Sequence, residues 1–551
     1  MRTANATADL LGNDVLLERC GSLRDDIRQF AARMAGNLPV RPGPDDQFLM
    51  HGHAWVETLV GAIDALVGWA GGLQAHGRLG TLERRLLGAG CAEYLGQITA
   101  GIAMSQDEVF RPGHLGMADE AHTLALKYVD LTDLGIDRTG GAILAEINDR
   151  GSLGDAGLDE TLTMIARQFG TFADERIAPY AQDWHRNDQL VPIEIVNELA
   201  ELGVFGLTIS ETYGGSDMGK LAMCVVTEEL SRGYIGVGSL GTRSEIAGEL
   251  IMTHGTDAQK KEFLPRIVDG SLLPAAVFTE PNTGSDLAHL RTRAESTGGG
   301  WRLNGQKTWI THAARADLMT VLARTNPDNP GHKGLSLFLL RKTRGNADND
   351  FPDAGISGEE IEVLGYRGMK EYTLAFDDVD LPSDALLGMK EGQGFMQLMS
   401  TFEGARIQTA ARAVGVAQNA FELAHSYASE RIQFGEPLAR FQRVYGKLAR
   451  MAVDIVVARQ LTYAAARAKD AGRRCDIEAG MAKLLAARAA WSCADNALQI
   501  HGGNGYAVEY PISRVLCDAR ILNVFEGAAE IQAEVIARGL KTARDRSAVE
   551  A

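Results

Sequence analysis

One stretch of the chain, between about Ala275 and Leu387, has a different residue pattern from everything around it. It contains short runs of β-forming residues, such as 318–323 and 335–340, separated by Gly, Asn, Asp and Pro. Such runs and breaks predict strands joined by turns. The flanking sequence is rich in Ala, Leu and Glu and repeats its apolar residues at three- and four-residue spacing, which is typical of amphipathic helices. A β domain between helical segments is therefore the expected framework.

A segment rich in Gly and Asp, from Asp133 to Asp159, divides the helical sequence further. We interpret it as a linker at a domain boundary, preceded by helices that include 55–67 and 82–98. The predicted organisation is an N-terminal helical extension with its linker (1–150), a helical domain (151–274), a central β domain (275–390) and a C-terminal helical bundle (391–551).

The net charge of −17 at pH 7 argues against nucleic acid as a partner. A duplex carries dense negative charge and requires a basic face, which this sequence does not offer. The six cysteines are scattered without CxxC pairs or ligand-like His/Cys spacing, so we expect neither a disulfide framework nor a metal site.

The start of the chain lacks the basic residues and apolar core of a signal peptide. No run of about 18 uninterrupted apolar residues occurs, so we expect no membrane span. Both features favour a cytoplasmic protein.

Two glycine motifs resemble nucleotide-binding sequences without meeting their requirements. Residues 214–220 have the spacing of a phosphate-binding loop, but Leu221 stands where Ser or Thr would hold magnesium. Residues 88–90 begin like a dinucleotide fingerprint but lack its third glycine. We interpret residues 214–220 as a turn between helices and residues 88–90 as part of an ordinary helix.

Two segments of the β domain combine residues that suit a flat redox cofactor. Residues 278–286 contain Gly and hydroxyl side chains, which allow backbone N–H groups to approach an anion or a ring edge. Asn304-Gly305 predicts a hairpin turn, after which Trp309 and Thr311 point to the same side of a strand. Each segment alone is a weak signal, because a tryptophan on a strand usually belongs to the core.

These segments occur in one order with three more in the bundle, at 431–435, 499–506 and 524–527. Together they resemble the acyl-CoA dehydrogenase family of flavoproteins, over residues 157–545. The resemblance implies a mainly α fold with a helical domain, a central β-barrel or sandwich domain and a four-helix bundle. The N-terminal helical module is an addition to that fold.

The resemblance also implies which residues contact FAD. The isoalloxazine contacts in the β domain would be Phe278, Thr279, Ser285, Trp309 and Thr311, with hydrogen bonds from Thr279 and Thr311. The contacts to the pyrophosphate and adenosine of a neighbouring subunit's FAD would be Arg431, Phe434, Gln442, Gln499, Gly502 and Gly503, so at least a homodimer is required. Ala528 and Glu530 lie beside the cofactor in this pattern, where family members often have a hydroxyl and an amide.

Glu526 is the candidate catalytic base. A proton α to a thioester is weakly acidic, so its removal requires a poorly solvated carboxylate whose pKa is raised toward the working pH. Glu526 lies between Phe525 and Gly527, and the family has its catalytic glutamate at the matching position. Taken alone, it could also be a glutamate that favours a helix N-terminus. Some relatives take the base from the position of Ala405, which carries no carboxylate here.

In the same resemblance, a hydride leaves the β carbon for flavin N5 as the base removes the α proton. The base's backbone N–H and an FAD hydroxyl stabilise the charge that develops on the thioester oxygen. Ser285 would border the thioester channel, and Gly527 would lie at the substrate.

Two features narrow the choice of acyl group in the substrate. One is the long N-terminal extension, and the other is the presence of Met369 and Glu371 where many relatives have Ser and Thr. These features resemble a branch of the family that oxidises a short, branched dicarboxylic acyl-CoA and passes electrons to electron-transfer flavoprotein. The free carboxylate of such a substrate requires a cation or several donors. Arg243 and Arg406 are the candidates. Arg243 could equally be a surface residue of a helix, and Arg406 could instead orient the active site.

Several alternatives stay open at this point. A dehydrogenase or an oxidase of another short acyl-CoA would keep the same residues, and a non-catalytic flavoprotein would keep only the fold. The extension either covers the acyl-CoA entrance and excludes water, or acts as a dimerisation or stability module.

Overall fold

The computed structural model describes residues 12–550 and divides into two compact units. Unit 1 consists of Met1–Met164 and Thr409–Ala551, and unit 2 of Ile165–Gln408. Most of the sequence that predicted the absence of a signal peptide lies in residues 1–11, outside the described residues.

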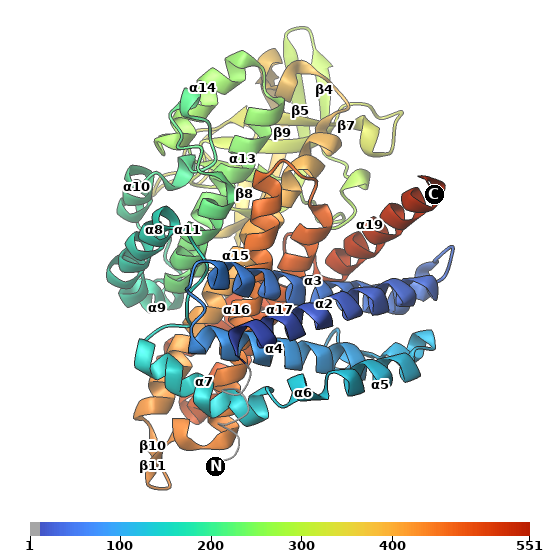
Figure 1. Ribbon diagram of the computed structural model, residues 1–551. Helices are drawn as coiled ribbons and strands as arrows, with labels where there is room; N and C mark the ends of the chain where they lie inside the picture. The colour runs from blue at the N-terminus through green and yellow to red at the C-terminus, as the bar shows by residue number, and fades with distance from the viewer. Residues whose placement is uncertain (1–11, 551) are drawn as a thin grey trace. The chain divides into compact units, whose positions relative to one another are not determined.

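Unit 1 is built from helices (Figure 1). Those of the extension are α2 (Asn13–Gly36), α3 (Gln47–Ala75), α4 (Thr81–Ala100), α5 (Ala118–Lys127), α6 (Val129–Thr132) and α7 (Ile136–Arg150), with the short hairpin of β1 (Ile102–Ala103) and β2 (Val109–Phe110). Those of the bundle are the second part of α15 (Gly394–Glu430), α16 (Gln442–Asp470), α17 (Asp476–His501), α18 (Pro511–Ile521) and α19 (Ala529–Glu550), with the hairpin of β10 (Ile432–Gln433) and β11 (Glu436–Pro437). The helices predicted at 55–67 and 82–98 are confirmed within α3 and α4.

The linker predicted at 133–159 is wrong for most of its length. Residues 136–150 form α7, which packs against α4 and α16. Gly140 lies on the packed face, where a Cβ would come within 3.2 Å of Ala449 Cβ. The glycines that suggested a chain break instead allow two helices to approach closely.

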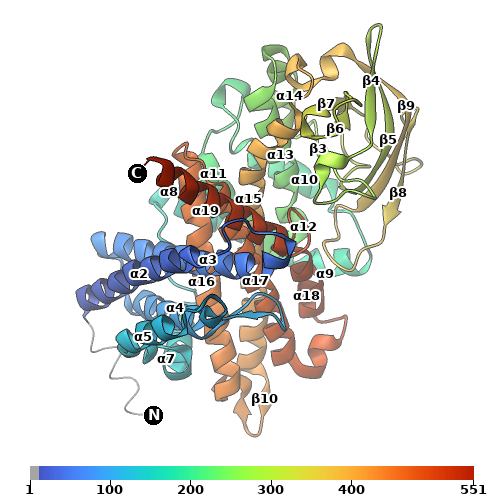
Figure 2. The ribbon, with the colours of Figure 1, turned by 90° about the vertical axis from the view of Figure 1, so that its right-hand side faces the viewer.

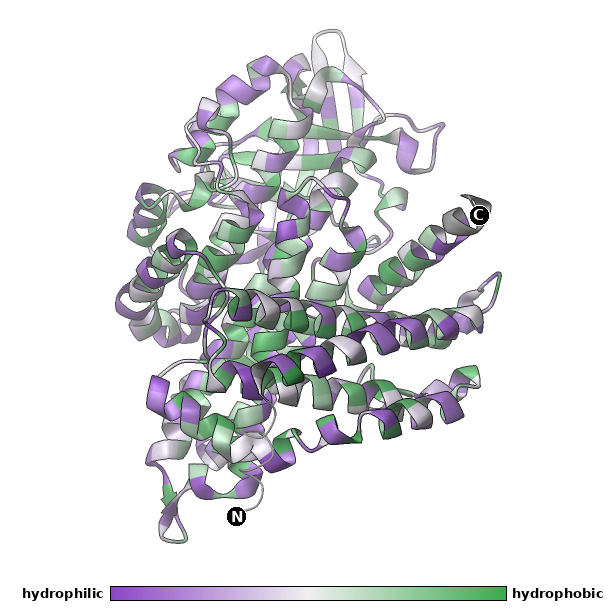
Figure 3. Ribbon diagram, viewed as in Figure 1, coloured by the Kyte–Doolittle hydropathy of each residue, from purple (hydrophilic) through white to green (hydrophobic). Residues whose placement is uncertain are grey.

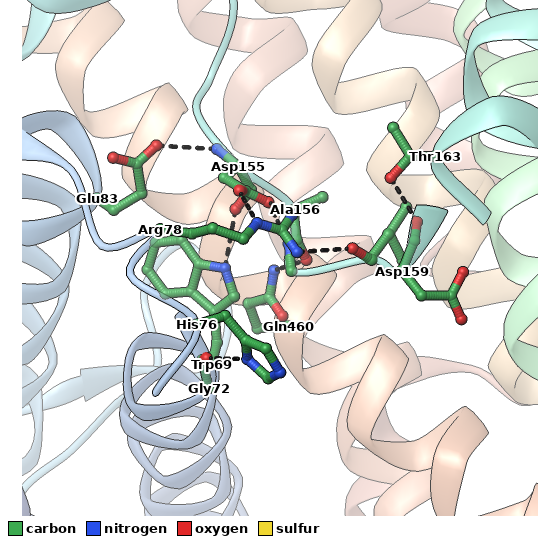
Figure 4. Close-up of polar contacts among 12 residues, drawn as sticks. Trp69, Gly72, His76, Arg78, Glu83, Asp155, Ala156, Asp159, Thr163 and Gln460 are labelled. Atoms are coloured by element: carbon green, nitrogen blue, oxygen red, sulfur yellow. Dashed lines mark hydrogen bonds and ion pairs between the residues drawn. The ribbon is translucent and has the colours of Figure 1, made fainter. Parts of the chain in front are cut away.

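Residues 151–159 do lack regular structure, and hydrogen bonds fix them to both parts of unit 1 (Figure 4). Arg78 Nε donates to Asp155 Oδ2 (2.7 Å), and Trp69 Nε1 donates to the Asp155 carbonyl (2.9 Å). From the bundle, Gln460 Nε2 donates to a backbone carbonyl of the same segment (3.0 Å). These hydrogen bonds therefore fix residues 151–159 to the rest of unit 1.

Helix α3 is the core helix of unit 1 and packs against α2, α4, α16, α17 and α19 (Figure 3). The helical span Pro44–Ala75 is long and apolar enough to cross a membrane by length and composition, with a mean hydropathy of 1.3, but 61% of its most apolar window is buried within the protein. Gly90 of α4 lies where a Cβ would meet Leu66 of α3 (2.7 Å) and Val457 of α16 (3.3 Å). The extension and the bundle therefore share one hydrophobic core.

Unit 2 begins with a helical part. Its helices are the greater part of α8 (Glu160–Phe172), continued through a π-helical turn at Ala173–Ile177 into α9 (Ala178–Arg186), then α10 (Ile193–Glu201), α11 (Gly219–Gly233), α12 (Ile235–Gly238), α13 (Leu240–His254) and α14 (Asp257–Val268). Residues 214–218 form the turn expected before α11. Lys220, the last residue of the rejected phosphate-loop pattern, forms ion pairs with Glu245 and Glu249 of α13.

A seven-stranded sheet follows, in the order β3-β6-β4-β5-β9-β8 with β7 paired to β6 (Figure 2). Its strands are β3 (Pro274–Val277), β4 (Arg293–Thr297), β5 (Gly300–Thr311), β6 (Leu318–Arg324), β7 (Leu335–Arg341), β8 (Ile356–Ile361) and β9 (Glu371–Pro382). The strands predicted at 318–323 and 335–340 are confirmed as β6 and β7. The predicted fold class, mainly helical with a central β domain, is confirmed.

The hairpin turn predicted at Asn304-Gly305 is wrong. Strand β5 continues through both residues, and the turn between β4 and β5 lies at 298–299. The register of β5 against β9 shifts between Leu303 and Gly305. Gly305 has a φ of 146°, and a Cβ there would lie 2.6 Å from Thr292 Oγ1. Gly305 therefore permits a β-bulge with close backbone approach rather than a turn.

Candidate active site

Glu526 lies in the short connection between α18 and α19 of unit 1. Its φ of 51° is in the left-handed region, and Gly527 follows with a φ of 88°. The φ of Gly527 favours glycine, and a Cβ there would lie 2.0 Å from Gln532 Nε2, so a larger residue would displace that side chain. A non-glycine residue in this conformation is held by its surroundings, and such positions cluster at active sites.

The Glu526 side chain contacts two residues of α15. Arg412 Nη2 lies 2.7 Å from Glu526 Oε2, and the Thr409 hydroxyl donates to the same oxygen. The Glu526 side chain is 16% exposed, whereas that of Arg412 is fully buried, with Cζ 4.9 Å from the centre of the Phe525 ring. The candidate base is thus shielded from water, as the chemistry requires, but a buried cation also favours its ionised form.

Two buried side chains hold the backbone of this connection. Lys483 Nζ of α17 donates to the Gly527 carbonyl (2.6 Å), and Gln532 Nε2 of α19 donates to the Glu526 carbonyl (3.1 Å). Sequence reasoning did not single out either residue or Arg412. For Lys483 and Arg412, the sequence did offer one signal: each is a basic residue within an Ala-rich helical segment, where a buried charge is costly unless it has a partner.

A buried ion pair anchors the predicted flavin loop to β5 in unit 2. Lys307 Nζ lies 3.0 Å from Glu280 Oε1 and donates to the Phe278 carbonyl (2.9 Å). Burial lowers the pKa of Lys307 to about 8, although the Glu280 charge opposes this shift. The pKa of Glu280 is lowered despite burial, because Lys307 and hydrogen bonds from Thr292 favour the carboxylate. The loop backbone is therefore fixed where the cofactor contacts are expected.

The prediction that Trp309 and Thr311 share one side of the strand is wrong. Trp309 has a φ of 58° and is 56% exposed, whereas Thr311 is buried, because the register of β5 shifts between Lys307 and Ile310. The Thr311 hydroxyl donates to Glu371 Oε1 (2.8 Å), which belongs to its cross-strand partner on β9. The hydroxyl can therefore serve a flavin group only as an acceptor.

The rest of the predicted flavin loop is partly open. Phe278 is buried, Thr279 is half-buried and Ser285 is exposed. The Thr283 hydroxyl is buried and has no hydrogen-bond partner within the part of the chain that the structure describes. A buried hydroxyl without a partner is costly, so a polar group of a ligand fits at this position.

The two predicted carboxylate-binding arginines lie in unit 2. Arg243 is buried in α13, with Nη2 3.4 Å from the Tyr366 hydroxyl, so the interpretation as a surface residue is wrong. Arg406 is half-buried on α15, with Cζ 5.9 Å from the centre of the Phe402 ring.

The residues predicted to reach a neighbouring subunit's FAD lie on the exposed surface of unit 1. Phe434, at the tip of the β10–β11 hairpin, is 95% exposed and has a φ of 54°. Gly502 and Gly503 border open space, since a Cβ added at either position would have no neighbouring atom within 4 Å. The remaining members, Arg431, Gln442 and Gln499, are also exposed. Of the two residues after the base that were predicted to lie beside the cofactor, Glu530 is exposed and Ala528 is half-buried.

Three family models match consecutive parts of the chain. They are the acyl-CoA dehydrogenase N-terminal domain at 159–271, the middle domain at 275–379 and the C-terminal domain at 392–541. The chain belongs to the acyl-CoA dehydrogenase family. It is therefore an oxidoreductase of a flavoprotein family.

A (2S)-methylsuccinyl-CoA dehydrogenase of Cereibacter sphaeroides is 57% identical over 507 residues, which cover 92% of each chain. A solved glutaryl-coenzyme A dehydrogenase with glutaryl-CoA is 35% identical, with a TM-score of 0.66, and covers 70% of this chain and 95% of its own. A chain in the structure of the electron transferring flavoprotein of Acidaminococcus fermentans is 32% identical, with a TM-score of 0.66, over 70% of this chain and 98% of its own. The alignment of 507 residues is longer than the segment 159–541 that the three family models span. The methylsuccinyl-CoA relative therefore shares much of the N-terminal extension.

Proposed function

We propose that this enzyme binds FAD and oxidises (2S)-methylsuccinyl-CoA to mesaconyl-CoA, with electrons passing to an electron-transfer flavoprotein. The observation that carries the reaction is Glu526, shielded from water on a left-handed turn that fixes its direction. The substrate assignment is supported by the relative of that specificity, whose similarity extends into the N-terminal helices.

Glu526 removes the proton from the α carbon, and its carboxyl group carries that proton. The turn presents the carboxylate, while Lys483 and Gln532 hold the adjoining carbonyls and so restrict movement of the turn. A base held in one orientation loses little entropy as it reacts. FAD, when bound, supplies the acceptor for the hydrogen and electron pair that leave the β carbon.

The residues of unit 2 fit a flavin. Trp309 offers an exposed flat ring, Thr283 a buried hydroxyl that needs a polar partner, and Thr311 a hydroxyl that acts as an acceptor. Thr279 and Ser285 remain predicted contacts on the open part of the loop.

A panel of thioesters tests the substrate assignment. With a dye as electron acceptor, we expect mesaconyl-CoA from (2S)-methylsuccinyl-CoA. We expect kcat/KM values lower by about 10- to 100-fold for glutaryl-, isobutyryl- and butyryl-CoA. The two monocarboxylic thioesters lose a charged hydrogen bond, and glutaryl-CoA aligns its carboxylate poorly. Reaction of only the monocarboxylic thioesters would contradict the substrate assignment. Peroxide production under air at the rate of dye reduction would favour an oxidase.

We also propose at least a homodimer, in which the bundle surface around Phe434 contacts the partner subunit's FAD. A contiguous exposed apolar patch on a protein surface marks an interaction site. The β10–β11 hairpin presents Phe434 and Ile432, which are 95% and 59% exposed.

Phe434→Asp is expected to reduce both dimer formation and FAD retention, because a carboxylate would have to be buried in the subunit interface. Light scattering after gel filtration and the flavin-to-protein absorbance ratio measure these properties. Val40→Asp, at an 81% exposed position of the extension, is the matched control. A Phe434→Asp protein that stays dimeric and fully loaded with FAD would rule out the shared cofactor site.

A further inference from the structure

A fully buried arginine of α15 lies against the candidate base, although nothing in the sequence drew attention to it. Arg412 Nη2 contacts both Glu526 Oε2 and Thr409 Oγ1, each at 2.7 Å. Thr409 precedes Arg412 by three residues and therefore lies on the same face of the helix. A buried guanidinium requires an anionic partner, and the partner here is the carboxylate that the reaction protonates.

The proposed substrate places a second carboxylate close to that group. In methylsuccinyl-CoA the free carboxylate is bonded directly to the β carbon, about 2.5 Å from the α carbon by ordinary bond lengths. The base must come within about 3 Å of the carbon from which it removes the proton. Two carboxylates therefore meet within a few ångströms of each other, and like charges at that separation in a shielded site repel strongly unless a cation lies beside them.

We propose that Arg412 binds the free carboxylate of the acyl group and is the residue that selects dicarboxylic substrates. This inference rests on the proposed function. The planar fork of an arginine matches a carboxylate with two parallel hydrogen bonds. Arg412 exchanges its bond to Glu526 for bonds to the substrate, and Glu526 Oε2 then accepts the α proton.

The exchange predicts that an acyl-CoA without a carboxylate reacts poorly. Such a thioester offers no replacement anion, so Arg412 stays on Glu526 and weakens it as a base. The sequence candidates for this role have other surroundings, because Arg243 lies beside Tyr366 and Arg406 beside Phe402 in unit 2. Arg412 differs from both in its direct contact with Glu526.

Two variants of the FAD-loaded enzyme test the inference, with methylsuccinyl-CoA and isobutyryl-CoA as the substrate pair. Arg412→Gln is expected to lower the ratio of the two kcat/KM values about 100-fold, the loss of a charged hydrogen bond to a carboxylate. Arg412→Lys is expected to lower it about 10-fold, because an ammonium keeps the charge without the fork. The matched control is Arg459→Gln, another buried arginine of unit 1, which donates to Gln418 Oε1 (2.5 Å) and should leave the ratio unchanged.

The pH profile of kcat/KM for isobutyryl-CoA provides a readout that a merely structural role would not move. Arg412 of α15 contacts the Glu526 carboxylate, and Lys483 of α17 contacts the Gly527 carbonyl of the same turn. The two helices that the turn joins carry further charges, at Arg514, Asp518 and Arg520 of α18 and at Glu530 of α19. Removal of the Arg412 charge alone favours protonated Glu526, so the acidic limb of the profile should move to higher pH in Arg412→Gln.

An unchanged substrate ratio in either Arg412 variant would overturn the inference while leaving the proposed function intact, provided that the wild-type enzyme prefers methylsuccinyl-CoA. If Arg412→Gln does not fold, the ratio in Arg412→Lys decides. If the wild-type enzyme shows no such preference, the proposed substrate fails and the inference fails with it.

Discussion

Without residues 1–150, the rest of the chain is expected to be insoluble or unfolded. Helix α3 buries large apolar side chains that include Leu59, Ile63, Leu66 and Val67. Full burial of each such side chain contributes about 1.5–3 kcal/mol, while the net stability of a domain is roughly 5–15 kcal/mol. Loss of this helix alone removes a large part of that stability and exposes the apolar surface of the bundle.

The polar contacts of the extension add to this effect. Arg488 of α17 lies 4.3 Å from the centre of the Trp55 ring, Arg450 of α16 pairs with Glu93, and the Tyr94 hydroxyl lies 3.5 Å from Asp454 Oδ1. These bundle charges would lose partners on removal of the extension, and buried charges without partners are strongly destabilising.

Soluble yield, far-UV circular dichroism and thermal melting measure the outcome. A point variant gives the same test within the full chain. Leu66→Asp should destabilise by at least about 3 kcal/mol, since it places a charge in the core. Leu126→Asp, at a 60% exposed position of α5, should melt like the wild type. A soluble truncated enzyme with normal melting and kinetics would contradict both a stability role and the hypothesis of a cover over the acyl-CoA entrance.

Glu526→Gln is expected to lower kcat by about 1,000-fold, within the range typical of a lost general base. Glutamine keeps the size of the side chain and can still accept hydrogen bonds from Arg412 and Thr409, but its amide cannot take up the α proton. FAD content and acyl-CoA binding should therefore be preserved. Glu478→Gln, at an exposed carboxylate of α17, is the matched control and should keep full activity. Glu526→Gln activity within about tenfold of the wild type would rule out Glu526 as the base.

The fold class was predictable because it depends on local patterns. Helical spacing at 55–67 and β-forming runs at 318–323 survive in the structure, since each depends on neighbours only a few residues away. Glycine was the main source of error. The glycines of 133–159 and Gly305 suggested breaks and turns, whereas Gly140 and Gly305 serve close packing that only the folded chain reveals.

The candidate site was predictable only in part for the same reason. Glu526 was identified through the family resemblance, but its partner Arg412 lies 114 residues away in sequence. No local spacing marks such a pair, because α15 and the turn before α19 meet only through tertiary packing. The bulge that exposes Trp309 and buries Thr311 is likewise set by pairing of β5 with β9.

The most direct test is the flavin absorbance after rapid anaerobic mixing with (2S)-methylsuccinyl-CoA. We expect the wild-type flavin to lose its absorbance within a single turnover, and Glu526→Gln to bind the same thioester without that loss. Flavin that bleaches equally fast in both proteins, or that stays oxidised in the wild type, would contradict the assignment of Glu526 as the base for this substrate.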